Sequence, residues 1–304
     1  MANVENVVRR LEDMMGYQIR VEKVTKNGVE LTAITNMCGT VCPTCYFEDV
    51  TADGVNDVVA AERIAKTFEY AMHANALTFV DFEAFIKSLT PDSLEARICA
   101  KGNAGKNVIT IPFLDDLEIY PIITFAFREE KVGIKITEEI AKNVPWIFPL
   151  FEGGGICMNA INNSFKKTKQ FDYTDMVIHT LAKACADGQI SEIELNRVIK
   201  DMLKKNVDSV MKILTNNTAC GGAIAIADKA ALKRLSKDFD DDFYIIPSSV
   251  HEIICIKADK VDGDIDQLKN MVLDINANVL DPLDKLTDSV YFFSRDTNLV
   301  TRVM

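Results

Sequence analysis

The sequence predicts an α+β protein, with mixed or antiparallel sheets, hairpins and packed helices in two subdomains. Strand-like runs are joined by short turns, such as Asn27-Gly28 between residues 17–24 and 29–34, and an Asn-Gly pair there is a strong hairpin signal. Other stretches repeat apolar residues at the three- and four-residue spacing of helices. The 304 residues are 48% hydrophobic, enough for about two domains. Hairpins mixed with helices favour this class over a doubly wound parallel sheet.

Residues 1–149 are expected to form an N-terminal α+β domain. Its first helix covers residues 4–15 and ends at Gly16, a common helix-stop residue. Further helices are expected at 55–74 and 80–89, and strands at 17–24, 29–34, 42–47, 94–100, 108–113, 118–128 and 132–136. Pro121 predicts an edge strand or a bulge, because proline has no N–H to donate to a neighbouring strand.

Residues 150–171 are expected to be an irregular linker or insertion, since they combine Gly153-Gly154-Gly155 with little periodicity. Residues 172–304 then form a C-terminal α+β domain. It opens with helices at 172–186 and 191–206, the second started by a capping box at Ser191 and Glu194. The remaining strands are expected at 211–215, 222–227, 243–247, 251–257 and 289–294, with helices at 229–239 and 265–279.

Composition limits the partners and the compartment. A net charge of -11 and a pI near 4.9 oppose binding to phosphate backbones, so nucleic acid is a disfavoured partner. The first residues lack the pattern of a signal peptide, and the apolar runs are shorter than a membrane span. Eight cysteines without a secretion signal fit a reducing compartment. We therefore expect a cytoplasmic protein with free thiols and no membrane partner.

Cys38, Cys42 and Cys45 have the spacing C-x3-C-x2-C, which resembles the motif of radical S-adenosylmethionine enzymes. Three such thiolates could hold three irons of a four-iron cluster. Thr44 stands where that family usually has an aromatic residue, and the expected hairpins differ from its barrel of βα units. The alternatives are an iron–sulfur cluster, a zinc site completed by a distant ligand, or, as we prefer, no cofactor and a strand that carries small apolar cysteines.

Segments of the last third carry a family resemblance: residues 212–216, Gly221-Gly222-Ala223, residues 242–254 and residues 288–291. They are similar to an uncharacterised family of anaerobic bacteria and their mobile elements, domain of unknown function 5688. Residues 27–31, 43–47 and 111–115 resemble it more weakly. The resemblance implies a shared fold, suggests a phage or mobile-element setting by association, and brings no mechanism with it.

The turn between the expected strands at 243–247 and 251–257 holds a candidate site. Ser248, Ser249, His251 and Glu252 lie there, and Asn216 belongs to the same family segments. Neighbours within one turn do not generally form a Ser–His–acid triad, whose members come from distant segments. One interpretation is a site for a small polar ligand or a partner. The other is structural, with serines that bond their own backbone.

Taken together, these features predict an accessory protein that binds a protein or a small molecule rather than an enzyme. The alternative is an iron–sulfur or other metal-dependent enzyme that uses Cys38, Cys42 and Cys45.

Overall fold

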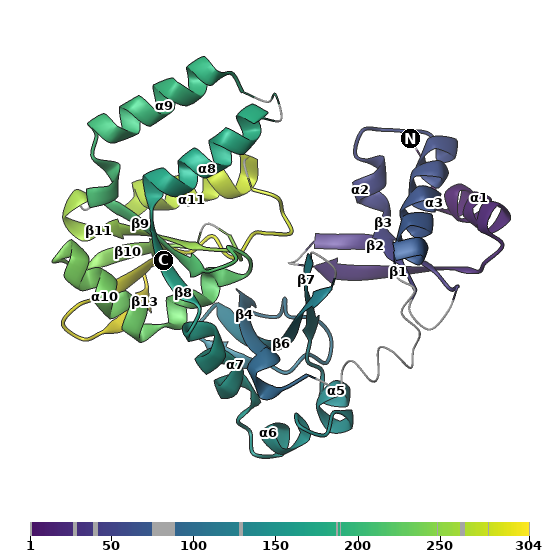
Figure 1. The fold of residues 1–304 in the computed structure, drawn as a ribbon, viewed down its shortest axis with the longest axis horizontal. Coiled ribbons are helices and arrows are strands. Elements are labelled where there is room, and N and C mark those ends of the chain that lie inside the picture. The colour runs from purple at the N-terminus through teal and green to yellow at the C-terminus, as the bar shows by residue number, and fades with distance from the viewer. Residues whose placement is uncertain are drawn as a thin grey trace. The chain divides into compact units, whose positions relative to one another are not determined.

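The computed structural model describes residues 2–26, 29–38, 42–74, 89–127, 130–186, 188, 190–247, 249–261, 265–278 and 280–303. The chain divides into two compact units, Met1–Leu89 and Thr90–Met304. The sheets of both units are antiparallel and helices pack on them, so the predicted α+β class is confirmed (Figure 1). The expected linker, residues 150–171, lies inside the second unit.

The first unit is a small sheet covered by helices. Strands β1 (Ile19–Lys26), β2 (Val29–Asn36) and β3 (Thr44–Tyr46) pair in that order. Helix α1 (Val4–Met15) starts where the Asn3 side chain accepts a hydrogen bond from the amide of Asn6, and it ends at Gly16, whose φ is 70°. Helices α2 (Phe47–Thr51) and α3 (Asp57–Ala74) follow β3.

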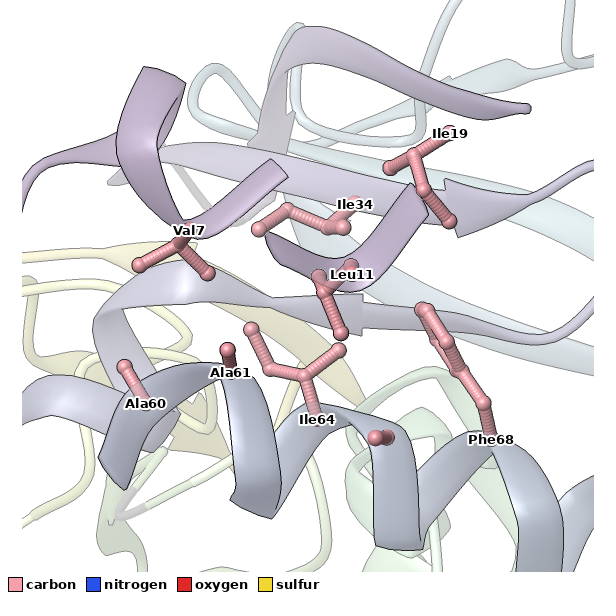
Figure 2. Packing of buried hydrophobic residues seen from close by; sticks show 9 residues of the cluster. Val7, Leu11, Ile19, Ile34, Ala60, Ala61, Ile64 and Phe68 are labelled. Carbon is pink, nitrogen blue, oxygen red and sulfur yellow. The ribbon is translucent and has the colours of Figure 1, made fainter. Parts of the chain in front are cut away.

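The core of the first unit lies between these helices and the sheet. Figure 2 shows the side chains of Leu11 from α1 and Ile64 from α3 facing one another. The cluster also contains Val7, Ile19, Ile34, Ala60, Ala61, Ala65 and Phe68. Burial of such side chains at roughly 1.5–3 kcal/mol each is the main term that stabilises the unit.

The second unit begins with a four-stranded sheet. Strand β6 (Leu117–Phe127) pairs with β4 (Leu94–Ala100) on one side and with β5 (Ile111–Phe113) and β7 (Glu130–Lys135) on the other. Pro121 is therefore in a central strand, and the expected edge position is wrong. The carbonyl of Pro121 accepts a hydrogen bond from the amide of Ile136. The missing N–H of Pro121 points to the same side of β6, where the neighbouring strand changes from β5 to β7. The absent donor therefore costs few hydrogen bonds between strands.

The second sheet of this unit has six strands, in the order β13 (Leu299–Arg302), β12 (Tyr291–Ser294), β10 (Phe243–Ile246), β11 (Ile253–Lys257), β9 (Met211–Asn216) and β8 (Thr168–Asp172). Alternate residues of β10 serve its two faces. On one face, Ile246 packs with Leu268 and Val272 of α11 (Ile265–Asn278). On the other face, the Phe243 ring stacks on Phe293 and meets Phe239 of α10 (Lys229–Phe239).

The remaining helices flank these sheets (Figure 1). They are α5 (Glu138–Asn143), α6 (Phe148–Glu152), α7 (Ile156–Phe165), α8 (Tyr173–Ala186) and α9 (Glu192–Lys204), with 3-10 turns η1 (Pro91–Ser93), η2 (Val207–Ser209) and η4 (Ala258–Lys260). The capping box predicted at Ser191 and Glu194 is confirmed. Within the described residues, no helix is both long and apolar enough to span a bilayer.

Two expected elements differ from the structure. Residues 222–227 form a buried 3-10 helix, η3 (Gly222–Ala227), instead of a strand, because a short, wholly apolar run does not distinguish the two by its periodicity. Residues 150–171 contain α7 and β8 instead of an irregular linker. The helix expected at 80–89 falls almost wholly on residues outside the described part of the chain.

Candidate functional site

The side chain of Asn216 organises the loop that follows β9. Its Oδ1 accepts hydrogen bonds from the Thr218 amide (3.1 Å), the Thr218 hydroxyl (2.9 Å) and the Cys220 amide (3.2 Å). Its Nδ2 donates to the Cys220 carbonyl at 2.8 Å. Asn216 is 5% exposed, so one buried amide fixes both ends of the loop.

The loop that Asn216 holds is presented to solvent. Asn217, Thr218, Ala219 and Cys220 are all exposed, whereas Asn216 and Gly221 on either side are buried. Ala219 has a φ of 48°, a left-handed conformation that costs an alanine roughly 1–2 kcal/mol. The hydrogen bonds of Asn216 keep the backbone in this strained conformation.

His251 fastens the end of this loop to a second segment. Its Nδ1 accepts a hydrogen bond from the Gly221 amide at 3.0 Å, and its Nε2 lies 3.1 Å from Oδ1 of Asp284. Asp284 also fixes the backbone, because its carbonyl accepts from the amide of Val250 at 2.8 Å. Three segments distant in the sequence thus meet at one imidazole.

The neighbours of the imidazole raise its pKa. The pKa of His251 is raised to about 9, first by a hydrogen bond with the Cys220 side chain and then by the Asp284 carboxylate, against the burial that lowers it. The ring is 31% exposed. Cys220, His251 and Asp284 therefore form one cluster at the surface.

The glycines after Cys220 allow close packing. A Cβ on Gly221 would lie 2.0 Å from Nε of Arg97, and Gly221 also has a φ of 63°. A Cβ on Gly222 would lie 2.2 Å from the Thr215 hydroxyl and 2.5 Å from the Asn216 amide. Any side chain at these two positions would displace the loop.

Arg97, which packs on Gly221, belongs to a buried charge network centred on Glu95. The Glu95 carboxylate is 1% exposed and lies 3.2 Å from Arg97 and 2.5 Å from the ammonium of Lys167. The hydroxyl of Thr124 also donates to it at 2.8 Å. The network fixes the position of Arg97 beneath the loop.

The predicted turn at residues 247–252 is present, with Ser249 at its centre. The Ser249 hydroxyl accepts from the amide of His251 at 3.0 Å and donates to Glu252 at 3.0 Å. This is the local backbone bonding of the structural interpretation. Ser248 lies outside the described residues. Asn216 and His251 both bind the Asn217–Cys220 loop, whereas Ser249 and Glu252 form the turn that positions His251.

The backbone amides beside Cys220 already have acceptors. The amide of Cys220 donates to Asn216, that of Gly221 to the His251 ring, and those of Gly222 and Ala223 to the carbonyls of His251 and Val250. An oxyanion hole needs amides aimed at an empty position beside the nucleophile. These four amides do not provide one.

The cysteine triplet lies in the first unit. Cys45 is in β3 and packs against the core of that unit. Burial, with a contribution from Asp49, raises the pKa of its thiol to about 12. Burial also raises the pKa of Cys38, with Cys42 as the second cause. Across the described part of the chain, no group of three His, Cys, Asp or Glu side chains is placed to hold a metal ion.

Sequence reasoning missed Cys220 and Asp284. Cys220 could have been found from the sequence, because it directly precedes Gly221-Gly222 in a family segment. Asp284 gave none, because it is 33 residues from His251 and belongs to a loop.

Comparison with known proteins gives one match. No curated protein and no solved structure matches the chain. A family model described as a family of unknown function, DUF5688, matches residues 2–295. This match covers nearly the whole chain, both units included. The chain therefore belongs to the DUF5688 family, as the resemblance of its motifs predicted.

Proposed function

We propose that this protein binds a partner protein through the exposed loop Asn217–Cys220, rather than acting by catalysis. The observation that carries the proposal is the hydrogen bonding of Asn216, which holds four consecutive exposed residues in one conformation that includes a strained Ala219. Strained backbone persists where the surrounding structure imposes it, and it gathers at sites of function.

A loop fixed in advance is suited to recognition. Binding costs free energy when a flexible segment must become ordered, and a preformed loop avoids that cost. Functional residues are often carried by loops on a rigid scaffold, and here β9, η3 and the turn before β11 provide the scaffold. A net charge of -11 favours a protein partner over a nucleic acid.

Two arguments support binding over catalysis. The amides of residues 220–223 are engaged, which removes the donors that acyl transfer requires. Cys45 lies in β3 and packs against the apolar core of the first unit, which supports a strand with small apolar cysteines.

We also propose a cytoplasmic location, supported by the eight cysteines of the chain, which a reducing compartment would keep as thiols. A phage or mobile-element setting, if the gene neighbourhood shows one, would make the partner a host or phage protein.

Site-specific cross-linking in the native host tests the proposal. A photoreactive amino acid at Asn217 is expected to give a discrete cross-linked product, whereas the same group at exposed Thr297, in the turn between β12 and β13, is not. The additional change Asn216→Ala should abolish the product while circular dichroism shows a folded chain. Equal products from both positions, or a product that survives Asn216→Ala, would show that the loop is not the recognition element.

A further inference from the structure

Cys220 combines exposure with a fixed position. Its backbone amide and carbonyl both form hydrogen bonds with the Asn216 side chain. Cys220 is nevertheless exposed to solvent. The next residue donates from its amide to Nδ1 of His251 at 3.0 Å. Cys220 therefore stands beside the imidazole and opens to solvent, unlike the buried Cys99, Cys157 and Cys255.

The charges around the imidazole favour proton transfer from the thiol. The Asp284 carboxylate, at Nε2, stabilises a ring that carries two protons. Arg97 packs on Gly221, the residue after Cys220, and Glu95 partly neutralises its charge. Glu252 is bonded to Ser249 in the adjoining turn. The Gly221 amide opposes protonation of Nδ1, so it competes with the thiol for that nitrogen.

We propose that Cys220 is a reactive thiolate, activated by His251 and Asp284, that undergoes exchange with the disulfides of low-molecular-weight thiols. Glutathione disulfide represents this substrate class. The inference goes beyond partner binding, because it assigns a site of covalent chemistry to the loop. The reactive thiolate would make the state of the recognition loop sensitive to the cellular thiol balance.

The geometry favours disulfides over acyl groups. Attack on an acyl carbon generates an oxyanion that needs amide donors, and the nearby amides of residues 220–223 are occupied. Attack on a disulfide generates no oxyanion, and it requires only a thiolate, an accessible path and a leaving thiol. The loop provides the first two.

The exchange balances without a further reactant. The Cys220 thiol gives its proton to the imidazole of His251, and the thiolate attacks one sulfur of the disulfide. A new S–S bond forms as the old one breaks, which oxidises Cys220 to a mixed disulfide and reduces the other half. The leaving thiolate takes the proton from the imidazolium.

Alkylation kinetics on the full chain test this proposal without any partner protein, so its failure is distinct from a failure of the binding proposal. Iodoacetamide labelling of Cys220 is followed from pH 5 to 10 by peptide mass spectrometry. An ordinary thiol has a pKa of about 8.5, and a fall to about 7 would raise the thiolate fraction at pH 7 from about 3% to about 50%. We expect Cys220 to titrate below 8 and to outpace Cys185, the internal reference on α8.

Two variants connect the reactivity to the cluster. His251→Gln should return the titration of Cys220 to about 8.5 and slow its reaction with glutathione disulfide at pH 7 by roughly three- to fourfold, because the thiolate fraction falls about 16-fold while the intrinsic nucleophilicity rises about four- to sixfold. Asp284→Asn keeps the Gly221 contact and should give an intermediate effect. Circular dichroism confirms folding of both. A wild-type Cys220 that titrates at 8.5 or above, or rates unchanged in both variants, would overturn the proposal.

Discussion

The phenol of Tyr291 donates a hydrogen bond to Oδ2 of Asp116 at 2.8 Å, across 175 residues of sequence. The contact joins β12 of the six-stranded sheet to the turn between β5 and β6 of the four-stranded sheet. The hydroxyls of Ser289 and Thr287 bond the same oxygen at 2.7 and 3.2 Å. Burial, followed by the bond to Asp116, raises the pKa of Tyr291 well above its usual range. Ser289 and Tyr291 of the family segment 288–291 thus bond the carboxylate of Asp116, the residue directly after the segment 111–115.

Tyr291→Phe is expected to lower the free energy of unfolding by about 1–3 kcal/mol, the usual contribution of a hydrogen bond to a charged group. The ring is fully buried, and phenylalanine keeps its packing. Urea unfolding of the purified chain measures the change. Tyr244→Phe is the matched control in β10, where the ring packs on Phe292 outside the Asp116 cluster. Equal losses in the two variants would contradict a specific role for the Asp116 contact.

Glu95→Gln is expected to destabilise the second unit by about 3–5 kcal/mol. The substitution keeps the size of the side chain but removes the charge that compensates Lys167 and Arg97, and breaking a buried ion pair leaves an uncompensated charge. Glu138→Gln supplies the control, because the Glu138–Lys142 pair at 3.1 Å is exposed and contributes about 0–1 kcal/mol. Chemical denaturation of both variants gives the comparison, and similar small changes would show that the network contributes little.

Gly222→Ala is expected to cost about 2–4 kcal/mol, because its Cβ would overlap the backbone amide of Asn216 and the carbonyl of His251, at 2.5 and 2.7 Å. Gly155→Ala is the control, since its Cβ would meet atoms only at 3.7 Å or beyond. That change should cost about 1 kcal/mol or less, the penalty of alanine at a helix N-cap. Thermal melting compares the stability of the two variants. Equal stability of Gly222→Ala and Gly155→Ala would show that the backbone around Gly222 can move to accommodate a Cβ at little cost.

Local signals predicted much of the fold. The Gly16 stop, the capping box at Ser191 and the periodicity of α3 depend on neighbours in sequence, and each appears as expected. The run Gly222–Ala227 was predicted to be a strand but forms a 3-10 helix. Its residues are buried, so they show no alternation of polar and apolar side chains that would indicate the type of element. The location of Pro121 depends on which strands flank β6, a tertiary property that the sequence does not reveal locally.

Only part of the candidate site could be predicted, because some of its residues stand in local motifs and others are brought together by the fold. Asn216 and His251 stand in motif segments that could be recognised, and the structure brings them to one loop. Cys220 and Asp284 acquire their significance only through contacts with His251 that the fold creates. The cysteine triplet had the stronger local pattern, yet Cys45 is partly buried and packs against a hydrophobic core.

Anaerobically purified protein is expected to contain less than stoichiometric iron, sulfide and zinc. Cys45 packs against the apolar core of the first unit, as small hydrophobic cysteines do. Elemental analysis of the wild type beside the triple variant Cys38→Ala, Cys42→Ala, Cys45→Ala gives the result. Stoichiometric iron and sulfide that disappear in the triple variant would establish a cluster, and zinc with the same behaviour would establish a structural site.

The contribution of His251 to stability should decrease as pH rises. Its pKa is about 9 in the folded chain and about 6.5 in the unfolded chain. Since the folded value is the higher one, the stabilisation is fully present below pH 6.5 and is lost as pH rises through 9. With partial exposure taken into account, its size is about 1–3 kcal/mol. Urea unfolding of wild type and His251→Gln should therefore differ most at pH 6 and least at pH 10.

Proton NMR gives a direct test of the same assignment, because the chain has only three histidines. The imidazole resonance that disappears in His251→Gln belongs to His251, and it should titrate near pH 9 in the wild type. Cys220→Ser removes the first cause of the raised value and Asp284→Asn removes the second, so each should move the midpoint toward 6.5. A wild-type midpoint already near 6.5, unmoved by either change, would mean that the amide of Gly221 prevails at Nδ1 and keeps the ring neutral.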